Sequence, residues 1–548
     1  MGKPALGRGK GHILALDVGT SALHCLLADP LGSPIATASA PMCYFRPDGC
    51  SLLTREFDPQ SILSTLGQLT VEVLKRGGVK ARDVSAIGIT SQRQGVVFLD
   101  GEGNEIYSGP NVDLRAIFEG AAMDEELGQE IYATTGHFPS FLLAPARLRW
   151  LRENRPSIYS KTHAILTVAG WLSYRLTGSL LSEPALEGEA GLLDIRTWER
   201  PAALLESLGV PLSLLPPLPQ ESLPRGALSR PMAALWGLSA GIPVFLVGPD
   251  TQCGLLGMGL VKEGQAGAVM GWSGAMQVLT SRPCQDEKMR TWVGLYPFDC
   301  VGDTPSGPGL SQPRSSRPPE SLWVAESNLG DAGNAYRWLK DILLGSDASF
   351  EEAERLALEA SASPDFDDQA VSAFLGPGPV SPSRSGLRMG GLLFSTPLSF
   401  QEATRGQLFR AALENIAYSL KANLTTLREV TGLDIQTLHL GGGMASSRTL
   451  AATLATVLGF PIKRSVTPQV SARGAALAVA VWVKNPSLTP SAALRTGPSA
   501  WLRASLEQAA ESAAKDCEEV EPGTASQIAQ YQESYQRWLH LYKRLELE

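Results

Sequence analysis

Apolar positions near the start of the chain recur with two different spacings. Short apolar runs bounded by Gly, Pro and Asp predict strands at residues 12–19, 23–29, 34–40, 84–90 and 95–100. Between the third and fourth runs, Ile62, Leu66, Leu69 and Val73 step by 4, 3 and 4 residues, which places them on one face of a helix. Asp58-Pro59 is a typical start for this helix, and Gly77-Gly78 is a typical end. Strands and helices therefore alternate, with hairpins mixed in, which predicts an α/β fold.

The same signals begin again near residue 242. Apolar runs predict strands at 242–250, 266–274 and 436–440, and helical spacing is found at 413–427, from about Ser447 onward and at 528–545. The last of these stripes is typical of a helix that packs on the core. We expect an N-terminal domain at 12–255 and a C-terminal domain at 256–548, with a disordered tail at 1–11. The Gly-, Pro- and Ser-rich segment 302–320 is predicted to be an insert.

Composition narrows the class of protein. The chain has 548 residues, of which 44% are hydrophobic and 19% charged, and its formal net charge is −8. This length exceeds what one core usually supports, which favours two domains. Neither a long apolar run nor a secretory h-region occurs, and the seven cysteines form no CxxC pair, so we expect a cytoplasmic protein. The acidic balance argues against nucleic acid as a partner but allows a local phosphate cradle.

An acidic residue beside glycine follows an apolar strand in each half. The first motif is Asp17-Val18-Gly19-Thr20-Ser21, and the second is Gly248-Pro249-Asp250-Thr251. Glycine lets backbone amides approach a phosphate, and a carboxylate at a strand end can hold Mg²⁺ or accept a proton. One such motif is a weak signal, because many matches are strand-to-turn junctions. We interpret the two motifs as the openings of two related halves. Together with two later glycine-rich loops, they predict phosphoryl transfer. These loops are Gly271-Trp272-Ser273-Gly274 and Gly441-Gly442-Gly443.

Other known chemistries are excluded or disfavoured. The sequence contains no GxxxxGK[ST] P-loop, and no GxGxxG opens a helix after the first strand. The histidines lack metal-ligand spacing, so structural roles are expected for His24, His137, His163 and His439. Cys253 has no evident histidine partner, which argues against a thiol nucleophile. For Trp272 a place in the core is favoured over a role in narrowing the phosphate loop. The acidic run 516–521 is expected on a solvated face.

The order of the motifs resembles that of the FGGY carbohydrate kinases, which belong to the actin-like ATPase superfamily. The motifs are DVGTS (17–21), EFDP (56–59), TSQRQG (90–95), NVDLR (111–115), RLRWL (147–151), YRLTG (174–178), GPDTQCGLLG (248–257), RAALEN (410–415), the GGG segment and ARGAALA (472–478). TSQRQG followed by NVDLR is most similar to the autoinducer-2 kinases, whereas most glycerol and xylulose kinases carry Trp at the position of Asn111. The resemblance implies two ribonuclease-H-like domains flanking a cleft.

The resemblance also implies roles for individual residues, with ATP and Mg²⁺ as cofactors. Asp250 matches the catalytic base, and Asp17 matches the acidic residue that binds Mg²⁺, usually through water. Gly19, Thr20 and Ser21 match the first phosphate loop, Gly271 and Ser273 the second, and Gly442 and Gly443 the adenosine motif. Gln92, Arg93 and Gln94 match the segment that contacts the substrate, and Asn111 and Asp113 are expected on the next substrate-side strand.

Several positions depart from the family pattern. His24 replaces the usual Lys or Arg, Trp272 stands where Gly is common, and the adenosine segment carries Met444, Leu450, Ala452, Thr456 and Gln469. Because these departures bear on nucleotide contacts, a kinase-fold ligand-binding or regulatory protein is one alternative to an enzyme. An actin-like ATPase acting on proteins is another.

The presence of both Asp17 and Asp250 favours an ATP-dependent kinase. Its substrate would be a hydroxyl of a small carbohydrate, polyol or related polyhydroxy carbonyl compound. An autoinducer-2-like substrate and a ketopentose or polyol both stay open. Homodimers are common in the family, but the sequence leaves the oligomeric state open. Neither nucleic acid nor a membrane is expected as a partner.

Overall fold

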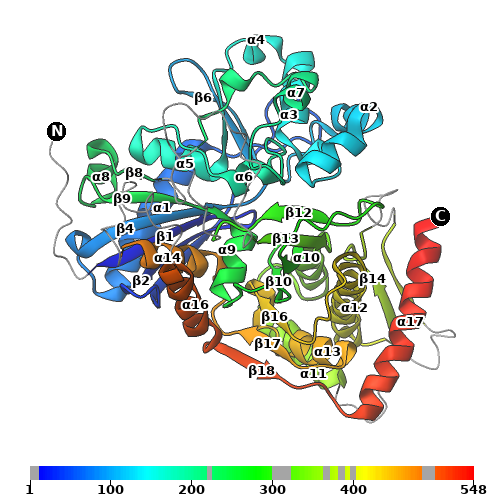
Figure 1. Ribbon diagram of the computed structural model, residues 1–548. Helices are drawn as coiled ribbons and strands as arrows, with labels where there is room; N and C mark the ends of the chain where they lie inside the picture. Colours follow the sequence, from blue (N-terminus) through cyan, green and yellow to red (C-terminus); the bar gives the residue numbers. More distant parts are fainter. Residues whose placement is uncertain are drawn as a thin grey trace.

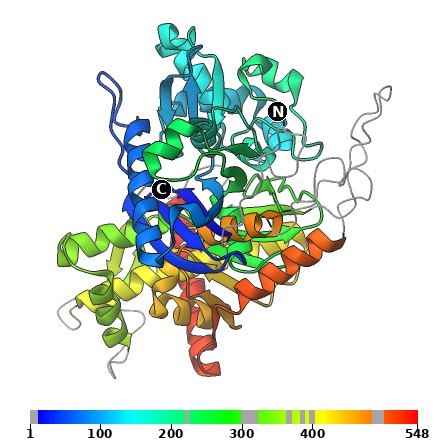
Figure 2. The same cartoon turned by 90° about the vertical axis from the view of Figure 1, so that its left-hand side faces the viewer.

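The protein is described from a computed structural model that covers residues 11–218, 225–298, 322–361, 371–380, 389–394, 403–483 and 500–547. Residues 1–10 of the predicted tail and the predicted insert 302–320 lie outside these ranges. Two large sheets form the body of the molecule, with helices between and around them (Figure 1). In both views the segment coloured cyan lies at one end and the orange and red segments at the other (Figures 1 and 2).

The first sheet has the strand order β3-β2-β1-β4-β9-β8. Its strands are β1 (His12–Val18), β2 (Ala22–Ala28), β3 (Pro34–Pro41), β4 (Val84–Ser91), β8 (Arg225–Ala227) and β9 (Pro243–Pro249). Strands β1, β2 and β3 form an antiparallel meander, and β1, β4 and β9 are parallel. The predicted helix is α1 (Pro59–Gly77), which begins after Asp58, whose carboxylate accepts from Gln60 N, and ends at Gly78. The predicted strands at 12–19, 23–29, 34–40 and 84–90 and the predicted helix are therefore confirmed.

A smaller antiparallel sheet, β6-β5-β7, is inserted between β4 and β9. It consists of β5 (Val96–Leu99), β6 (Glu105–Gly109) and β7 (Ala164–Thr167). The helices of this region are α2 (Ile117–Thr135), α3 (Ala144–Asn154), α4 (Pro156–Tyr159), α5 (Val168–Thr177), α6 (Pro184–Glu189), α7 (Ala202–Ser207) and α8 (Arg230–Trp236). Helix α6 contacts both β9 and a strand of the second large sheet, β12, so it reaches across to the other half.

The second large sheet has the order β12-β13-β11-β10-β16-β17-β18. Its strands are β10 (Ala266–Met270), β11 (Gly274–Thr280), β12 (Trp292–Leu295), β13 (Trp323–Asn328), β16 (Leu438–Gly441), β17 (Ile462–Ser465) and β18 (Cys517–Val520). The part β13-β11-β10-β16-β17 repeats the order β3-β2-β1-β4-β9 of the first sheet. This repeat confirms the α/β prediction of two ribonuclease-H-like halves.

Helices pack on the second sheet and between the two sheets. They are α9 (Asp250–Gly257), α10 (Ala332–Leu344), α11 (Phe350–Ser361), α12 (Arg405–Thr431), α13 (Arg448–Leu458), α14 (Val470–Val483), α16 (Ala500–Ala514) and α17 (Ala525–Leu547), and a hairpin of β14 (Val371–Phe374) and β15 (Gly391–Phe394) lies beside them. Helix α17 buries Tyr535, Trp538 and Tyr542, which confirms the predicted docking stripe. One buried cluster joins α9 and α14 to residues of both sheets, so the halves share a core.

One interpretation of the strand order is wrong. Strand β9 pairs with β4 in the first sheet, so the motif around Asp250 closes the first half and does not open the second. A buried apolar strand carries no signal for which sheet it joins, which explains the error.

The acidic run 516–521 lies on a solvated face, as predicted. The side chains of Asp516, Glu518, Glu519 and Glu521 are exposed. Residues 517–520 of this run form the edge strand β18, and Glu518 pairs with Arg464 of β17.

Candidate active site

Asp17 and Asp250 meet at one edge of the first sheet. Asp17 lies opposite Thr90 in the register of β1 and β4, and Thr90 lies opposite Gly248 of β9. The Thr90 hydroxyl donates to the Gly248 carbonyl at 2.7 Å, which ties the strand ends together. Asp250 begins α9 two residues later, and its Oδ1 accepts from the Thr251 amide at 2.9 Å. The two acidic residues thus come from parallel strands of one sheet.

The charges of these two carboxylates are coupled. Burial raises the pKa of Asp17 well above its usual range, and the neighbouring Asp250 raises it further. Asp250 is half-buried; its pKa is raised to about 6, chiefly by desolvation, while Arg93 and the Thr251 amide oppose the shift and the charges of Glu189 and Glu326 add to it. Oδ1 of Asp17 is buried and has no hydrogen-bond partner among the described residues. Oxygen donors of this kind fit Mg²⁺, which Asp17 would hold.

The position expected to carry a cation beside Asp17 is neutral. His24 is the register partner of Asp17 on β2. Burial lowers the pKa of His24 to about 4, so the ring is uncharged at neutral pH. The departure from Lys or Arg therefore removes a positive charge. Backbone amides and the metal would have to balance the phosphate charge at this loop.

The first phosphate loop is linked to the predicted substrate segment. Thr20 and Ser21 lie in the turn from β1 to β2, with Gly19 before them, and Thr20 Oγ1 accepts from Asn111 Nδ2 at 2.9 Å. The backbone N–H of Asn111 donates to Gln92 Oε1 at 2.8 Å. Asn111 and Asp113 follow the end of β6 in a turn, so the expectation that they lie on a strand is wrong. The links nevertheless bring Thr20, Gln92 and Asn111 together.

Arg93 is held by carboxylates from two elements. Its Nη2 donates to Glu326 Oε1 at 2.7 Å and its Nη1 to Glu326 Oε2, which makes a two-point pair with β13 of the second sheet. Nη1 also lies 3.4 Å from Oε2 of Glu189, at the end of α6. The guanidinium carbon is 5.4 Å from the centre of the Trp292 ring on β12. The predicted substrate residue therefore bridges the two sheets.

Polar side chains from three other segments contact Glu189. Its carboxylate accepts from Gln252 Nε2 at 2.6 Å and from Gln94 Nε2 at 3.4 Å, and it lies 3.1 Å from His137 Nε2. Burial raises the pKa of Glu189, but the charges of Arg93 and His137 outweigh burial and lower this pKa to about 2. The other ring nitrogen of His137 faces the Thr135 carbonyl at 2.7 Å.

Backbone strain marks the same segment. Gln94 has a φ of 57°, a left-handed conformation that is costly for a residue with a side chain. The buried Arg147 of α3 donates from Nη1 to the Gln94 carbonyl and helps to hold this conformation. Arg147 lies in the RLRWL motif, so two of the motifs meet here.

Asp113, the last of the predicted acceptor-side residues, has a fully buried carboxylate. It accepts from the Tyr107 hydroxyl at 2.7 Å, from Arg115 Nε at 2.6 Å and from the Arg55 amide at 2.9 Å. These contacts brace the loop that carries Asn111. The substrate-binding role of Asp113 stays a prediction.

The two remaining glycine-rich loops lie beside each other and beside α10. The turn from β10 to β11 carries Gly271 and Ser273, with the Gly271 amide donating to the Ser273 carbonyl at 2.9 Å. Gly442 has a φ of 90°, and a Cβ there would lie 2.4 Å from the Met270 carbonyl. A Cβ on Gly333 of α10 would lie 2.1 Å from the Gly271 carbonyl. The backbones thus approach as closely as glycine allows.

Trp272 is not a core residue, contrary to expectation. It is half-buried, its carbonyl accepts from the Asn334 amide at 3.1 Å, and the Arg337 guanidinium lies 4.7 Å from its ring centre. A tryptophan in a glycine-rich turn can therefore serve as a stacking surface beside the loops.

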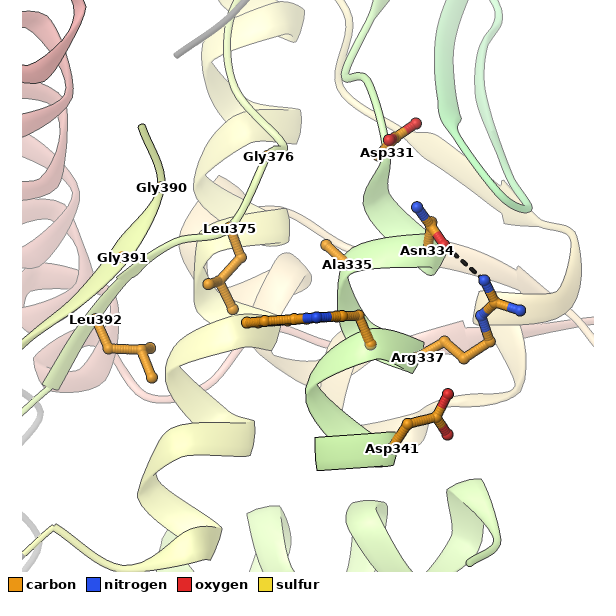
Figure 3. A pocket seen from close by; sticks show the side chains of 11 residues that line it. Asp331, Asn334, Ala335, Arg337, Asp341, Leu375, Gly376, Gly390, Gly391 and Leu392 are labelled. Carbon is orange, nitrogen blue, oxygen red and sulfur yellow. Dashed lines mark hydrogen bonds between the residues drawn. The ribbon is translucent and has the colours of Figure 1, made fainter. Parts of the chain in front are cut away.

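A pocket of about 540 Å³ lies on an adjoining face of α10 (Figure 3). In Figure 3, Asn334, Ala335, Arg337 and Asp341 project from the helix, and Leu375 and Leu392 face them from the strand side. Trp338, which also lines the pocket, is 52% exposed. The sequence contains no motif that identifies this pocket.

Four residues of the site were not predicted from the sequence: Glu189, Gln252, Gln277 and Glu326. All are buried, and Gln277 Nε2 joins Glu326 Oε2 at 2.8 Å to Thr251 Oγ1 at 3.1 Å. One signal was present, since Glu326 stands within the apolar strand WVAESN (323–328). A charged residue in a buried strand requires a partner, but the sequence does not say which one.

Comparison with known proteins identifies the family. The sequence model of the FGGY carbohydrate kinase N-terminal domain matches residues 12–257, and that of the C-terminal domain matches residues 298–482. The chain belongs to the FGGY family of carbohydrate kinases. It is therefore an enzyme of the phosphotransferase class, in a family that uses ATP and typically a divalent metal. The domain bounds 12–255 and 256–548 stay predictions.

Individual relatives agree with this assignment. The chain is 28% identical over 489 residues to an autoinducer-2 kinase of Escherichia coli (strain K12), covering 87% of each protein. The crystal structure of a xylulose kinase from Rhodospirillum rubrum has a TM-score of 0.75 at 22% identity, with coverage of 97% of this chain and 99% of that one. A gluconate kinase from Lactobacillus acidophilus has a TM-score of 0.77 at 16% identity, with 98% of both chains covered. These structures establish the shared fold. Among the described helices, none is long and apolar enough to cross a membrane.

Proposed function

We propose that this FGGY kinase transfers the γ-phosphoryl group of ATP to a hydroxyl of a small carbohydrate, polyol or related polyhydroxy carbonyl compound. The observation that carries the proposal is the proximity of Asp17 and Asp250 at the carboxyl ends of β1 and β9, two parallel strands of the first sheet with β4 between them. One of these groups has a buried oxygen without a donor among the described residues, and the other is half-buried and accessible. A metal ligand and a base are the parts that direct phosphoryl transfer needs.

In the proposed reaction Asp250 accepts the proton of the attacking hydroxyl. The acceptor oxygen forms a bond to the γ-phosphorus while the bond from that phosphorus to the bridging oxygen breaks, and ADP leaves. With a pKa of about 6, Asp250 is mostly ionised at neutral pH and can act as the base. Asp17 would hold Mg²⁺, which neutralises phosphate charge when bound.

The remaining predicted residues would position the two reactants. Residues 19–21 with Gly271 and Ser273 would receive the phosphates, and Gly442 and Gly443 the adenosine. Gln92, Arg93, Gln94, Asn111 and Asp113 would line or brace the acceptor side. Water exclusion by closure of the halves would suppress ATP hydrolysis.

We further propose autoinducer-2 and its linear precursor as the first acceptors to test. Asn111 donates to Thr20 where most glycerol and xylulose kinases carry Trp, and the autoinducer-2 kinase of E. coli is similar over most of the chain. A ketopentose or a polyol is the alternative acceptor, because the polar network around Arg93 suits any neighbouring hydroxyls.

A panel assay tests both proposals. Purified protein with ATP and Mg²⁺ is assayed for ADP release with the autoinducer-2 precursor, D-xylulose, D-ribulose, glycerol and D-glucitol. Acceptor-dependent ADP formation that disappears in Asp250→Asn supports the assignment. Equal ADP formation with and without every acceptor would contradict it.

A further inference from the structure

The guanidinium of Arg93 is committed to carboxylates of the protein. The edge formed by its Nη1 and Nη2 makes a two-point pair with Glu326, and Nη1 also reaches Glu189. The three side chains are almost fully buried, with exposed fractions of 7%, 2% and 1% for Arg93, Glu326 and Glu189. A planar guanidinium uses this same edge to grip the carboxylate of a ligand. In Arg93 that edge is already occupied.

Glu326 is itself fixed in place. Gln277 on the adjacent strand β11 donates to its Oε2 at 2.8 Å, and Asn328 Nδ2 lies 3.4 Å from its Oε1. The same Gln277 amide contacts Thr251, the residue after the proposed base. Glu326 therefore cannot move aside to release Arg93 without breaking several buried contacts, each of which leaves a polar group unpaired.

The charges around the proposed base are predominantly negative. Asp250 faces Asp17 from β1, Glu189 from α6 and Glu326 from β13, with Arg93 as the cation among them. The nearby Arg147 is fully buried and points at the Gln94 carbonyl, and His137 lies against Glu189. An acceptor bearing a carboxylate would add a further anion here without a free partner.

We propose that Glu326 is a specificity-determining residue: by holding Arg93 in a two-point ion pair from the second sheet, it restricts the acceptor to uncharged polyhydroxy compounds and excludes sugar acids. This rests on the proposed function, in which Arg93 lies on the acceptor side. Neutral hydroxyls can still exchange single hydrogen bonds with the network.

Two probes with the same carbon skeleton isolate the effect of charge. D-Gluconate carries a carboxylate where D-glucitol carries a CH₂OH group. Isothermal titration calorimetry measures the affinity of each for the wild-type chain and for Glu326→Gln, with no need for turnover. We expect Glu326→Gln to bind gluconate at least about tenfold more tightly than wild type, because the fork of Arg93 is freed. The affinity for glucitol should change by less than about threefold.

Matched variants show where the gain arises. The double variant Glu326→Gln with Arg93→Met should lose the gain for gluconate, because the guanidinium is absent. Glu414→Gln removes a carboxylate that is paired with Arg410 on α12 at 2.7 Å and 7% exposed, so it is a comparably buried control that should not alter gluconate binding. Glu326→Ala replaces Glu326→Gln if circular dichroism shows that the latter is unfolded.

The outcomes separate this inference from the proposed function. Wild-type protein that binds gluconate as tightly as glucitol would overturn it, as would a folded Glu326→Gln or Glu326→Ala without any gain for gluconate. A gain that persists in the double variant would also overturn it, because the anion would then bind elsewhere. Absence of kinase activity with every acceptor contradicts the proposed function and leaves these binding results standing.

Discussion

The proposed acceptor side and the proposed nucleotide side of this kinase are built from different groups. On the acceptor side, buried side chains hold one another: Arg93, Glu189 and Glu326 join segments from both sheets. On the nucleotide side, backbone meets backbone, and glycines at 333 and 442 allow the approach. The first arrangement depends on charge and partner, the second on the absence of a Cβ atom.

This difference explains how the adenosine segment can depart from the family pattern. Leu450 is fully buried in the core, and Thr456 donates to the Ala452 carbonyl at 2.8 Å and accepts from the Gly523 amide at 3.0 Å. These side chains serve packing and turn formation. The glycine cradle at 441–443 is retained, so the nucleotide side depends less on which side chains follow it.

The largest effect is expected at the proposed base. Asp250→Asn keeps the shape of the side chain but removes its capacity to accept a proton, so we expect kcat to fall about 10³-fold. Acceptor and ATP affinities should change little, which calorimetry can check. A variant with near-normal kcat would show that Asp250 is not the base.

Loss of a partner should destabilise the acceptor side strongly. Glu326→Ala leaves Arg93 buried without its two-point partner, so the unfolding free energy should fall by about 3 kcal/mol. Glu359→Ala, which breaks an exposed pair with Arg355 on α11, should cost less than about 0.5 kcal/mol. Urea unfolding of both variants measures the difference. Equal losses would mean that burial of the Arg93 pair contributes nothing.

The nucleotide side should instead be sensitive to the addition of a single Cβ atom. Gly442→Ala places a Cβ 2.4 Å from the Met270 carbonyl at a left-handed φ, so we expect KM for ATP to rise about tenfold. Gly101→Ala is the control, since a Cβ there also meets nothing within 4 Å and the residue lies outside the proposed nucleotide site. KM for the acceptor should be unchanged in both. If the two variants behave alike, close backbone approach is not what shapes this loop.

The two sides also differ in how far they could be predicted. Strand and helix spans of the first half, the caps of α1 and the loops around Gly19 and Gly442 follow from local patterns, because glycine, proline and periodicity act over a few residues. Motif order added the family and its two-half architecture. The partners of Arg93 could not be predicted, because Glu326 lies 233 positions away and pairs only through tertiary packing.

The placement of β9 and Trp272 failed for related reasons. A strand buried on both faces has the same apolar pattern in either sheet, so the Asp250 motif is misread from the sequence as the opening of the second half, although the predicted bounds 12–255 place it in the first. An aromatic residue in a glycine-rich turn resembles a core residue until Arg337 is found against its ring. Both errors concern contacts between distant segments.

The pH dependence of activity separates charge on the acceptor side from stability of the fold. Asp250 has a pKa raised to about 6, and only its ionised form can accept the hydroxyl proton. We therefore expect kcat/KM to fall about tenfold per pH unit below this pKa and to be level just above it. A raised carboxyl pKa means that the folded protein binds this proton more tightly than the unfolded chain, so protonation of Asp250 does not itself destabilise the fold. The test measures kcat/KM and urea unfolding in parallel between about pH 7.5 and 5. Activity should fall over this range without an equal loss of unfolding free energy. A flat kcat/KM profile over the range would exclude Asp250 as the titrating base.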